Sequence, residues 1–230
     1  MKRNLSSIVV LIVGILFIFG CSSPMTNTTE SSTNPSKHNQ ILFADEFDSL
    51  NTQVWSSFPS LTPFDGSEGS KMPGEVIVEN GLLKLSRYAP EIQGENPASL
   101  IQSKNTVALP ETFLATMRFR NEYTAFGFGS VFIQIYHHKI RIERRGPNGV
   151  ASDTYDYPYN DNSFFMLSFD VSKEGYTIRI KEDVPNATET EFSQQVDMSE
   201  FLGNSTITIW GGSNTQSAQY SEIDYIRINQ

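Results

Sequence analysis

From Ile41 to its last residue the chain consists of short segments in which apolar and polar side chains alternate. Alternation at period two is typical of strands with one buried side and not of helices. The clearest segments are rich in β-branched and aromatic residues; they are Glu75–Glu79, Leu82–Ser86, Phe113–Arg120, Val131–Tyr136, Lys139–Arg144, Phe164–Val171, Tyr176–Lys181, Ser205–Trp210 and Ile223–Ile228. We expect an all-β, two-sheet antiparallel sandwich of roughly ten to thirteen strands. Asn80-Gly81 and Glu174-Gly175 should form hairpin turns, and only Met198 to Leu202 would form a helical turn.

Cysteine usage and length limit how such a sandwich is stabilised. Cys21 is the only cysteine, so no disulfide forms within the chain and stability has to come from a buried core. The about 190 residues after residue 40 suffice for one domain. The chain carries 17 Lys and Arg residues against 26 Asp and Glu, a net charge of −9. This acidic balance, with no basic segment longer than Arg144-Arg145, argues against nucleic acid as a partner.

The N-terminal residues resemble a bacterial lipoprotein signal. Lys2 and Arg3 precede the apolar run Ile8–Phe19, which is too short to span about 30 Å of hydrocarbon comfortably. The run leads into Ile18-Phe19-Gly20-Cys21, which resembles a lipobox. We expect removal of residues 1–20 and acylation of Cys21, with palmitate among the attached chains. The alternative is an uncleaved N-terminal membrane anchor.

Residues 21–40 are expected to be a disordered tether. The stretch after Cys21 is rich in Ser, Thr, Asn and Pro, with Met25 as its one large apolar residue. Such a segment cannot bury enough surface to offset the entropy of ordering it. The sandwich then comprises residues 41–230. It would be lipid-anchored at the cell membrane or outer membrane, facing away from the cytoplasm.

An ordered series of segments gives a more specific indication of the fold. The segments are Asp45–Asp48 followed by Trp55, then Val78–Leu85, Phe113–Arg120, Phe164–Asp170, Gly175–Ile180, Ile207–Gly212 and Glu222–Ile228. The series resembles glycoside hydrolase family 16 domains from Leu42 to Ile228. This resemblance implies a concanavalin A-like jelly roll with a sugar cleft on a concave sheet.

The catalytic strand is where the sequence departs from that family. Family members carry Glu-x-Asp-x-(x)-Glu on this strand, and retaining hydrolysis uses two carboxyl groups about 5–5.5 Å apart. In the aligned segment, Lys139–Glu143, alternation turns both isoleucines into the core and leaves Lys139, Arg141 and Glu143 on the other face. Only Glu143 matches an acid of the motif, at the general-acid position. Because Arg141 favours the ionised form of Glu143, the resemblance supports the fold and argues against hydrolysis.

Aromatic residues are the first candidates for sugar contacts beside Glu143. Trp210 matches a cleft tryptophan of the family and would stack on a sugar ring, with burial in the core as the alternative. Tyr155 and Tyr157 belong to the stretch Thr154–Tyr159, whose three tyrosines share one face if the stretch is extended. The alternative for these tyrosines is ordinary core packing.

Basic residues are the second group of candidates. Lys139, Arg141, Arg144 and His137 would make the cleft face locally cationic in an otherwise acidic protein. A cationic face would suit an anionic glycan such as a uronate or a sulfated polymer. The alternative is a solvated face whose cations pair with neighbouring acids.

Metal sites are predicted only through the resemblance. His137 and His138 are adjacent, would point to opposite faces and have no Cys or third His near them, which argues against zinc. Family members often hold a structural Ca²⁺ on the convex side of the sandwich. By that resemblance Asp224 would supply a carboxylate, Gly81 a backbone carbonyl and a residue near Glu46 a further ligand. The alternative is that Asp224 pairs with a neighbouring cation.

Together these features predict a monomeric surface lipoprotein whose sandwich binds extracellular or cell-wall polysaccharide without cleaving it. Two alternatives stay open. One is an active glycoside hydrolase of β-glucan or galactan with displaced acids, in which Glu143 would be the remaining catalytic residue. The other is an envelope structural or protein-docking module whose cleft is filled by its own side chains.

Lipidation can be tested directly on Cys21. When the full chain is expressed in a bacterium fed alkyne-labelled palmitate, we expect label on the wild type and none on Cys21→Ala, because the thiol receives the first lipid group. Ser22→Ala serves as the control and should keep the label. Equal labelling of wild type and Cys21→Ala would contradict the assignment.

Overall fold

The computed structural model describes residues 40–59, 76–86, 99–121, 123–136, 138–160, 162–211 and 220–230. The predicted signal, Cys21 and the tether lie outside these residues, and so does His137. No helix in the described ranges is both long and apolar enough to span a lipid bilayer.

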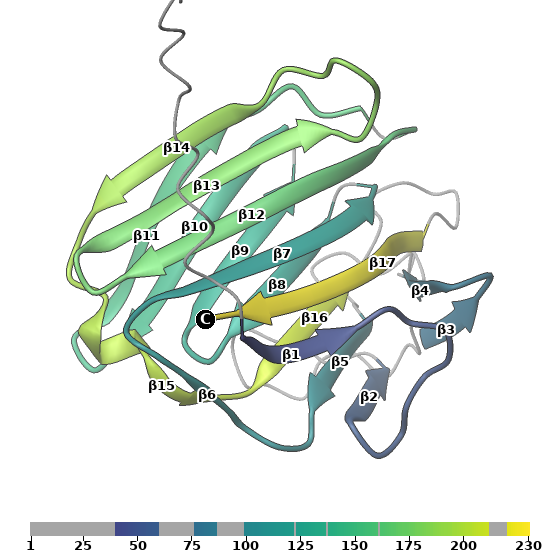
Figure 1. Ribbon diagram of the computed structural model, residues 1–230, viewed down its shortest axis with the longest axis horizontal. Coiled ribbons are helices and arrows are strands. Elements are labelled where there is room, and N and C mark those ends of the chain that lie inside the picture. Colours follow the sequence, from purple (N-terminus) through teal and green to yellow (C-terminus); the bar gives the residue numbers. More distant parts are fainter. Residues whose placement is uncertain are drawn as a thin grey trace, which may run out of the picture. The chain divides into compact units, whose positions relative to one another are not determined.

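Seventeen strands of the described chain form two large antiparallel sheets and a small one (Figure 1). The eight-stranded sheet follows the order β14 (Thr190–Gln195), β13 (Gly175–Glu182), β12 (Phe164–Ser172), β7 (Phe113–Arg120), β17 (Tyr220–Asn229), β4 (Leu82–Ser86) and β3 (Val76–Glu79), and β1 (Ile41–Asp45) also pairs with β17. The seven-stranded sheet follows the order β11 (Gly149–Asp156), β10 (Lys139–Gly146), β9 (Val131–Tyr136), β8 (Thr124–Phe128), β16 (Ile207–Gly211), β5 (Ser99–Ser103) and β2 (Trp55–Pro59). β15 (Gly203–Ser205) pairs with β6 (Val107–Leu109), and one 3₁₀ turn, η1, spans Ser199–Phe201.

Aromatic rings hold the two large sheets together. Phe113 and Phe119 of β7 meet Phe128 and Phe126 of β8 across the sandwich, with ring centroids 6.0 and 5.7 Å apart. Phe169 of β12 lies 6.0 Å from Phe128 and 6.5 Å from Phe113. All five rings are at most 2% exposed. Burial of one such side chain stabilises a fold by about 1.5–3 kcal/mol, so this layer takes the place of the missing disulfides.

The start of the sandwich is fixed by one acidic side chain. Asp45 ends β1; its Oδ1 accepts the backbone N–H of Phe47 at 2.8 Å and its Oδ2 accepts the indole N–H of Trp55 at 2.7 Å. The Trp55 ring is 2% exposed and packs edge to face on Phe43 at 5.4 Å. The acid and the tryptophan of the first motif are therefore structural partners in this chain.

The Asn80-Gly81 turn is confirmed, whereas the second turn consists of Lys173 and Glu174, one residue earlier than the predicted Glu174-Gly175. Asn80 and Gly81 between β3 and β4 have φ values of 55° and 72°, and two positive values in succession are what a type I′ turn requires. Gly175 opens β13 after the second turn, at φ 155°. A Cβ at Gly175 would lie 2.1 Å from the carbonyl oxygen of Gln194, so only glycine fits there.

The predicted sandwich and the single helical turn at Ser199–Phe201 are confirmed, but the predicted number of strands was too low. β5 and β8 are buried at nearly every position, so they lack the polar alternation by which strands are recognised. β11 and β14 form edges of the two sheets. Both are largely polar and exposed, so their sequences resemble loops.

Removal of one core ring tests the importance of the aromatic layer. We expect Phe169→Ala to lower the free energy of unfolding by about 3–5 kcal/mol, because it removes buried area and leaves a cavity between the sheets. Val184→Ala is the matched control; Val184 is 47% exposed, so its loss should change stability by less than about 0.5 kcal/mol. Urea unfolding of both variants measures the difference. Equal effects would contradict the proposed role of the core rings.

Candidate functional site

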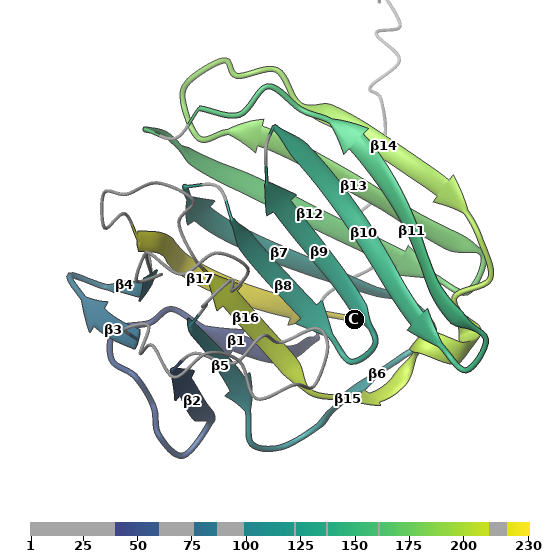
Figure 2. The same ribbon diagram turned by 180° about the vertical axis from the view of Figure 1, so that it is seen from behind.

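The outer face of the seven-stranded sheet gathers most of the predicted ligand contacts. Ile140 and Ile142 of β10 are fully buried between the sheets, so the alternate residues of this strand point outward, as predicted. The described residues of this face are Lys139, Arg141, Glu143 and Arg145 of β10, Phe132, Gln134 and Tyr136 of β9, Ala125 and Gly127 of β8, Thr208 and Trp210 of β16, Leu100 and Gln102 of β5, Ser56 of β2, and Val150, Ser152, Thr154 and Asp156 of β11. Figure 2 views the molecule from the side of this sheet.

One row across the outer face joins a cation, an amide and an indole. Arg141 lies opposite Gln134 of β9, Gln134 lies opposite Ala125 of β8, and Ala125 lies opposite Trp210 of β16. Trp210 is half-buried, whereas its neighbour Ile209 is fully buried in the core. The structure therefore places Trp210 on the same face as Arg141, Lys139 and Glu143.

β8 carries almost no side-chain bulk on this face. Its outward residues are Ala125 and Gly127, between the larger side chains of β9 and β16. A Cβ at Gly127 would lie 2.8 Å from Cε1 of Phe132 and 3.2 Å from Cβ of Thr208. The Phe132 ring thus lies over the glycine, and the small residues separate Trp210 from Gln134.

The charges of the outer face lie on its β10 and β11 side. Glu143 is the central acid: its Oε1 accepts Nε of Arg145 at 2.7 Å and its Oε2 lies 3.1 Å from Nη2 of Arg141. Both oxygens are therefore engaged, and the side chain is only 7% exposed. Lys139 pairs with Asp156 at 3.3 Å near the end of the strands, where the Asp156 side chain is 89% exposed.

Arg141 keeps donor capacity that its ion pair does not use. Its Nε is buried and has no hydrogen-bond partner, and its side chain as a whole is 33% exposed. A guanidinium has five N–H donors in a planar fork. Contact with one oxygen of Glu143 leaves most of these donors available to another acceptor.

Arg144 does not belong to the outer face, contrary to the prediction. It has the same parity as Ile140 and Ile142, so alternation turns it inward, where it is 6% exposed. There Arg144 donates to Asp153 and, at 3.3 Å, to the hydroxyl of Tyr176. Tyr176 in turn donates to Asp153 at 2.7 Å, so this arginine joins β10 and β11 to β13 of the opposite sheet.

Tyr155 and Tyr157 share a face, as predicted, but it is the inner one. The Tyr155 ring stacks on Phe192 at 4.7 Å and its hydroxyl lies 3.2 Å from that of Tyr176. Tyr157 is 7% exposed and meets Phe165 edge to face at 5.8 Å. Both tyrosines therefore pack in the core, which is the alternative that the sequence left open. Neither lies beside Arg141 and Trp210.

The buried cluster around Arg144 changes the pKa values of Tyr176 and Asp153. Burial raises the pKa of the Tyr176 hydroxyl, and its hydrogen bonds with Tyr155 and Asp153 act in the same direction. For Asp153 burial acts to raise the pKa, but hydrogen bonds from Tyr176 and Arg144 outweigh it. The pKa of Asp153 consequently lies below its ordinary value.

The two carboxylates among the predicted calcium ligands, Asp224 and Glu46, are engaged by arginines. β17 lies beside β4 at Ile223 and beside β1 from Ile226 onward, so Asp224 lies where the two partners change. Asp224 accepts Nη1 of Arg118 at 2.8 Å, and Glu46 accepts Nε of Arg227 at 2.7 Å. Within the described ranges, no three His, Cys, Asp or Glu side chains group as a metal site would. Asp224 thus pairs with a cation, Arg118, which is the alternative that the sequence left open.

Sequence reasoning missed the contributions of β9 and β5. Alternation in Val131–Tyr136 turns Phe132, Gln134 and Tyr136 outward. Only two residues separate this segment from Lys139, so a hairpin that places β9 beside Arg141 could have been inferred from the sequence. Gln102 of β5 donates to the hydroxyls of Thr206 and Thr208 at 3.4 and 3.3 Å. This contact depends on a pairing between strands that are far apart in the chain.

Comparison with known proteins identifies the fold. No protein-family model and no curated protein sequence matches the chain. Among solved structures, the CBM2 module of an evolved Dit protein from Lactobacillus casei BL23 phage J-1 is similar at TM-score 0.59 and 12% identity, over 83% of this chain and 95% of that one. Lectin I from Ulex europaeus, in complex with the methyl glycoside of α-L-fucose, is similar at TM-score 0.55 and 11% identity, over 81% and 96%.

An enzyme shares the same architecture. A prokaryotic β-1,3-1,4-glucanase (lichenase) derived from a mouse hindgut metagenome matches at TM-score 0.52 and 13% identity, over 83% of this chain and 99% of that one. The Ca²⁺-bound form of the VIP36 exoplasmic/lumenal domain matches at TM-score 0.52 and 9% identity, over 83% and 90%. The chain therefore has the concanavalin A-like fold that lectins, carbohydrate-binding modules and glucanases share.

The depressed pKa of Asp153 gives a pH-dependent contribution to stability. Because the pKa is lower in the folded than in the unfolded state, the contribution is complete above about pH 4 and is lost as the pH falls through the folded value. We expect Asp153→Asn to lower the free energy of unfolding by about 3 kcal/mol at pH 7, since it leaves Arg144 buried without its acid. The difference from wild type should shrink towards pH 2.

Asp156→Asn is the control for this measurement, because Asp156 lies three residues further along β11 and its side chain is 89% exposed. It should leave stability nearly unchanged at both pH values. Urea unfolding of the three proteins at pH 7 and pH 2 measures the effect. A cost for Asp153→Asn that stays constant with pH would contradict the ionised pairing.

Proposed function

We propose that the sandwich is a non-catalytic polysaccharide-binding domain of a surface lipoprotein. One observation carries this proposal: the outer face of the seven-stranded sheet brings Trp210 into a row with Gln134 and Arg141. An indole offers a flat apolar surface for a sugar ring. Amide and guanidinium groups supply hydrogen bonds in fixed directions. Ligand sites of this kind combine an apolar surface with a few oriented polar groups.

The placement of the carboxylates supports binding without hydrolysis. On the described part of the outer face the acids are Glu143 and Asp156, and Asp156 lies opposite Lys139, four residues from Glu143 along the sheet. Four residues of strand span about 13 Å, whereas glycosidases hold their two carboxyl groups about 5–5.5 or 6.5–9.5 Å apart. Both oxygens of Glu143 are also engaged, one by a hydrogen bond from Arg145 and the other by an ion pair with Arg141, whereas a general acid has to reach the leaving oxygen of a substrate.

β9 offers no replacement for these acids. It lies between β8 and β10 in the sheet, and its outward side chains are Phe132, Gln134 and Tyr136. The Glu-x-Asp-x-(x)-Glu pattern of family 16 hydrolases is therefore missing from β9 as well as from β10. The lipid anchor at Cys21 and the tether to residue 40 would hold the binding face outside the cytoplasm, at the cell membrane or outer membrane.

The function is tested by measuring binding and cleavage on the same samples. The purified full-length protein is incubated with a panel of neutral and anionic polysaccharides; retention is measured by affinity electrophoresis and cleavage by new reducing ends. We expect retention on at least one polymer and no new reducing ends. Release that disappears in Glu143→Gln would contradict the proposal and establish a hydrolase. Neither retention nor release on any polymer would favour a structural or docking module.

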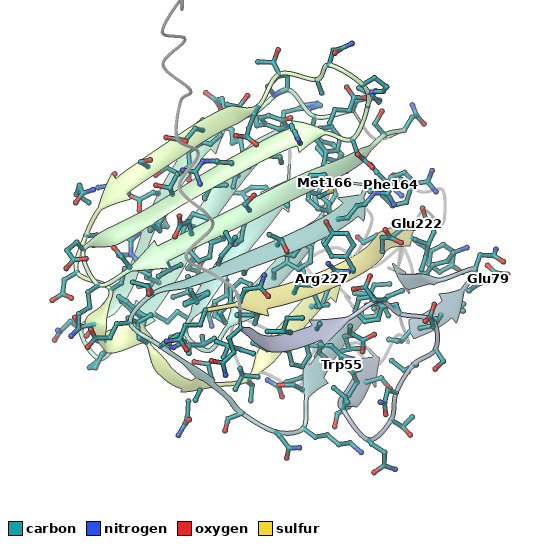
Figure 3. The ribbon with its side chains drawn as sticks, in the orientation of Figure 1. Trp55, Glu79, Phe164, Met166, Glu222 and Arg227 are labelled. Carbon is teal, nitrogen blue, oxygen red and sulfur yellow. The ribbon has the colours of Figure 1, made fainter. Side chains whose placement is uncertain are left out.

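Trp210→Ala identifies the face that binds. We expect it to weaken retention at least tenfold, because an aromatic anchor commonly contributes 2 kcal/mol or more to binding. Phe164→Ala is the matched control, because Phe164 is a half-buried ring on the outer face of the opposite sheet (Figure 3). It should bind as wild type does. Equal loss in both variants would contradict binding at the seven-stranded sheet.

We also propose a structural Ca²⁺ at the bend of β17. The support is that Asp224 lies where β17 passes from β4 to β1, near the Gly81 hairpin and Glu46, and that a fold neighbour binds Ca²⁺. Binding would require Asp224 to turn from Arg118. Millimolar Ca²⁺ should raise the melting temperature of the wild type and not of Asp224→Ala. No shift in the wild type would refute the site.

A further inference from the structure

We infer that the polysaccharide bound by the outer face of the seven-stranded sheet is acidic, and that Arg141 binds its carboxylate or sulfate groups. This inference rests on the proposed binding function and names the chemical class of the ligand. It is carried by three features: the way Glu143 is shared, the excess of donors on the face, and the place of Arg141 in the row with Trp210.

The first feature is the contrast between the two sheets. On the outer face of the eight-stranded sheet, arginines have carboxylates of their own: Arg120 pairs with Glu222, Arg179 with Glu191 and Arg227 with Glu46. Figure 3 shows Glu222 and Arg227 along β17. Arg118 has two acids, Asp183 and Asp224. These cations are neutralised within the chain.

On the outer face of the seven-stranded sheet, Arg141 and Arg145 instead share the single carboxylate of Glu143. No other acid within the described residues pairs with Arg141, and its Nε has no hydrogen-bond partner. Arg141 therefore shares its one acid with a second cation, in a protein whose net charge is −9. An anion is the ligand group that would complete the pairing.

The second feature is the balance of hydrogen-bonding groups. A neutral sugar offers hydroxyls, which both donate and accept, so its site needs acceptors as well as donors. Here the central acceptor, Glu143, already has both oxygens engaged. The guanidinium of Arg141 provides only donors, and the amide of Gln134, which has both a donor and an acceptor, can turn its NH₂ toward the same group at this position of the β9–β10 pair. A carboxylate or sulfate oxygen, which only accepts, matches this set.

The third feature is distance along the row. Arg141 and Trp210 are separated by β9 and β8, and three strand spacings amount to roughly 14 Å. One sugar ring cannot contact both side chains. An acidic polymer crossing the strands would place one residue on the indole and the acid group of another at Arg141. Glu143 would hold the guanidinium in position from the other side.

The experiment uses matched pairs of polymers that differ only in charge. Polygalacturonate is compared with its fully methyl-esterified form, and dextran sulfate with dextran; the two pairs distinguish carboxylate from sulfate. Binding of the purified full-length protein is measured by isothermal titration calorimetry. Arg141→Gln is compared with Arg179→Gln, because the two arginines are 33% and 34% exposed on opposite sheets. Thermal unfolding confirms that each variant is folded.

We expect wild type to bind one charged polymer at least tenfold more tightly than its uncharged partner. Arg141→Gln should weaken that binding about ten- to hundredfold, as loss of charge-assisted hydrogen bonds does, while Arg179→Gln changes it less than about twofold. Equal loss in both variants would show diffuse charge attraction and overturn the inference. Equal affinity for charged and uncharged polymers would overturn it and leave the proposed function standing. If no polysaccharide binds at all, the proposed function fails with it.

Discussion

The layer of phenylalanine rings between the two sheets is the constraint on which the other features depend. With one cysteine in the chain, no disulfide joins the sheets, and Phe113, Phe128 and Phe169 meet at their centre. Each ring occupies an inward position of its strand. Once these positions are fixed, period two decides which residues of every strand face outward. The outer face of the seven-stranded sheet is thus a consequence of how the core is filled.

This rule explains what could be predicted from sequence. The isoleucines of β10 mark its inner side, so Arg141 and Glu143 were correctly predicted to share the other face, and the alternating segments gave the fold class. The same rule corrects the expectation for Arg144, whose parity is that of the isoleucines. An arginine is tolerated there because Asp153 and Tyr176 bind it. The inward turn of Tyr155 follows from its place opposite Ile140 of β10.

The composition of the outer face could not be predicted in the same way. The row from Arg141 to Trp210 depends on the pairing of β16 with β8, and a local pattern does not reveal which distant strands pair. Gly127 illustrates the limit: its closeness to Phe132 and Thr208 appears only when three strands are assembled. The ordered resemblance to family 16 domains indicated the architecture, but its catalytic motif could not indicate the ligand of a chain that lacks the acids.

The outer faces of the two large sheets differ mainly in how their arginines are paired with acids. On the eight-stranded sheet the arginines pair with acids of their own, which stabilises the sheet and leaves little charge for a ligand. On the seven-stranded sheet Arg141 is incompletely paired; it lies next to the amide of Gln134 and in the same row as the indole of Trp210. An incompletely paired cation on a partly buried face costs free energy in the absence of ligand. Under the inference drawn above, binding of an anionic group would offset that cost.

The most direct test of the account is to observe which side chains respond to a bound polysaccharide. NMR spectra of labelled protein resolve the indole N–H of Trp210, the amide of Gln134 and the Nε–H of Arg141 as side-chain signals. We expect an oligosaccharide of the retained polymer to shift these signals and those of the backbone amides of β9, β10 and β16. No shifts are expected along β12 and β13. Shifts confined to the eight-stranded sheet would contradict the assignment of the binding face.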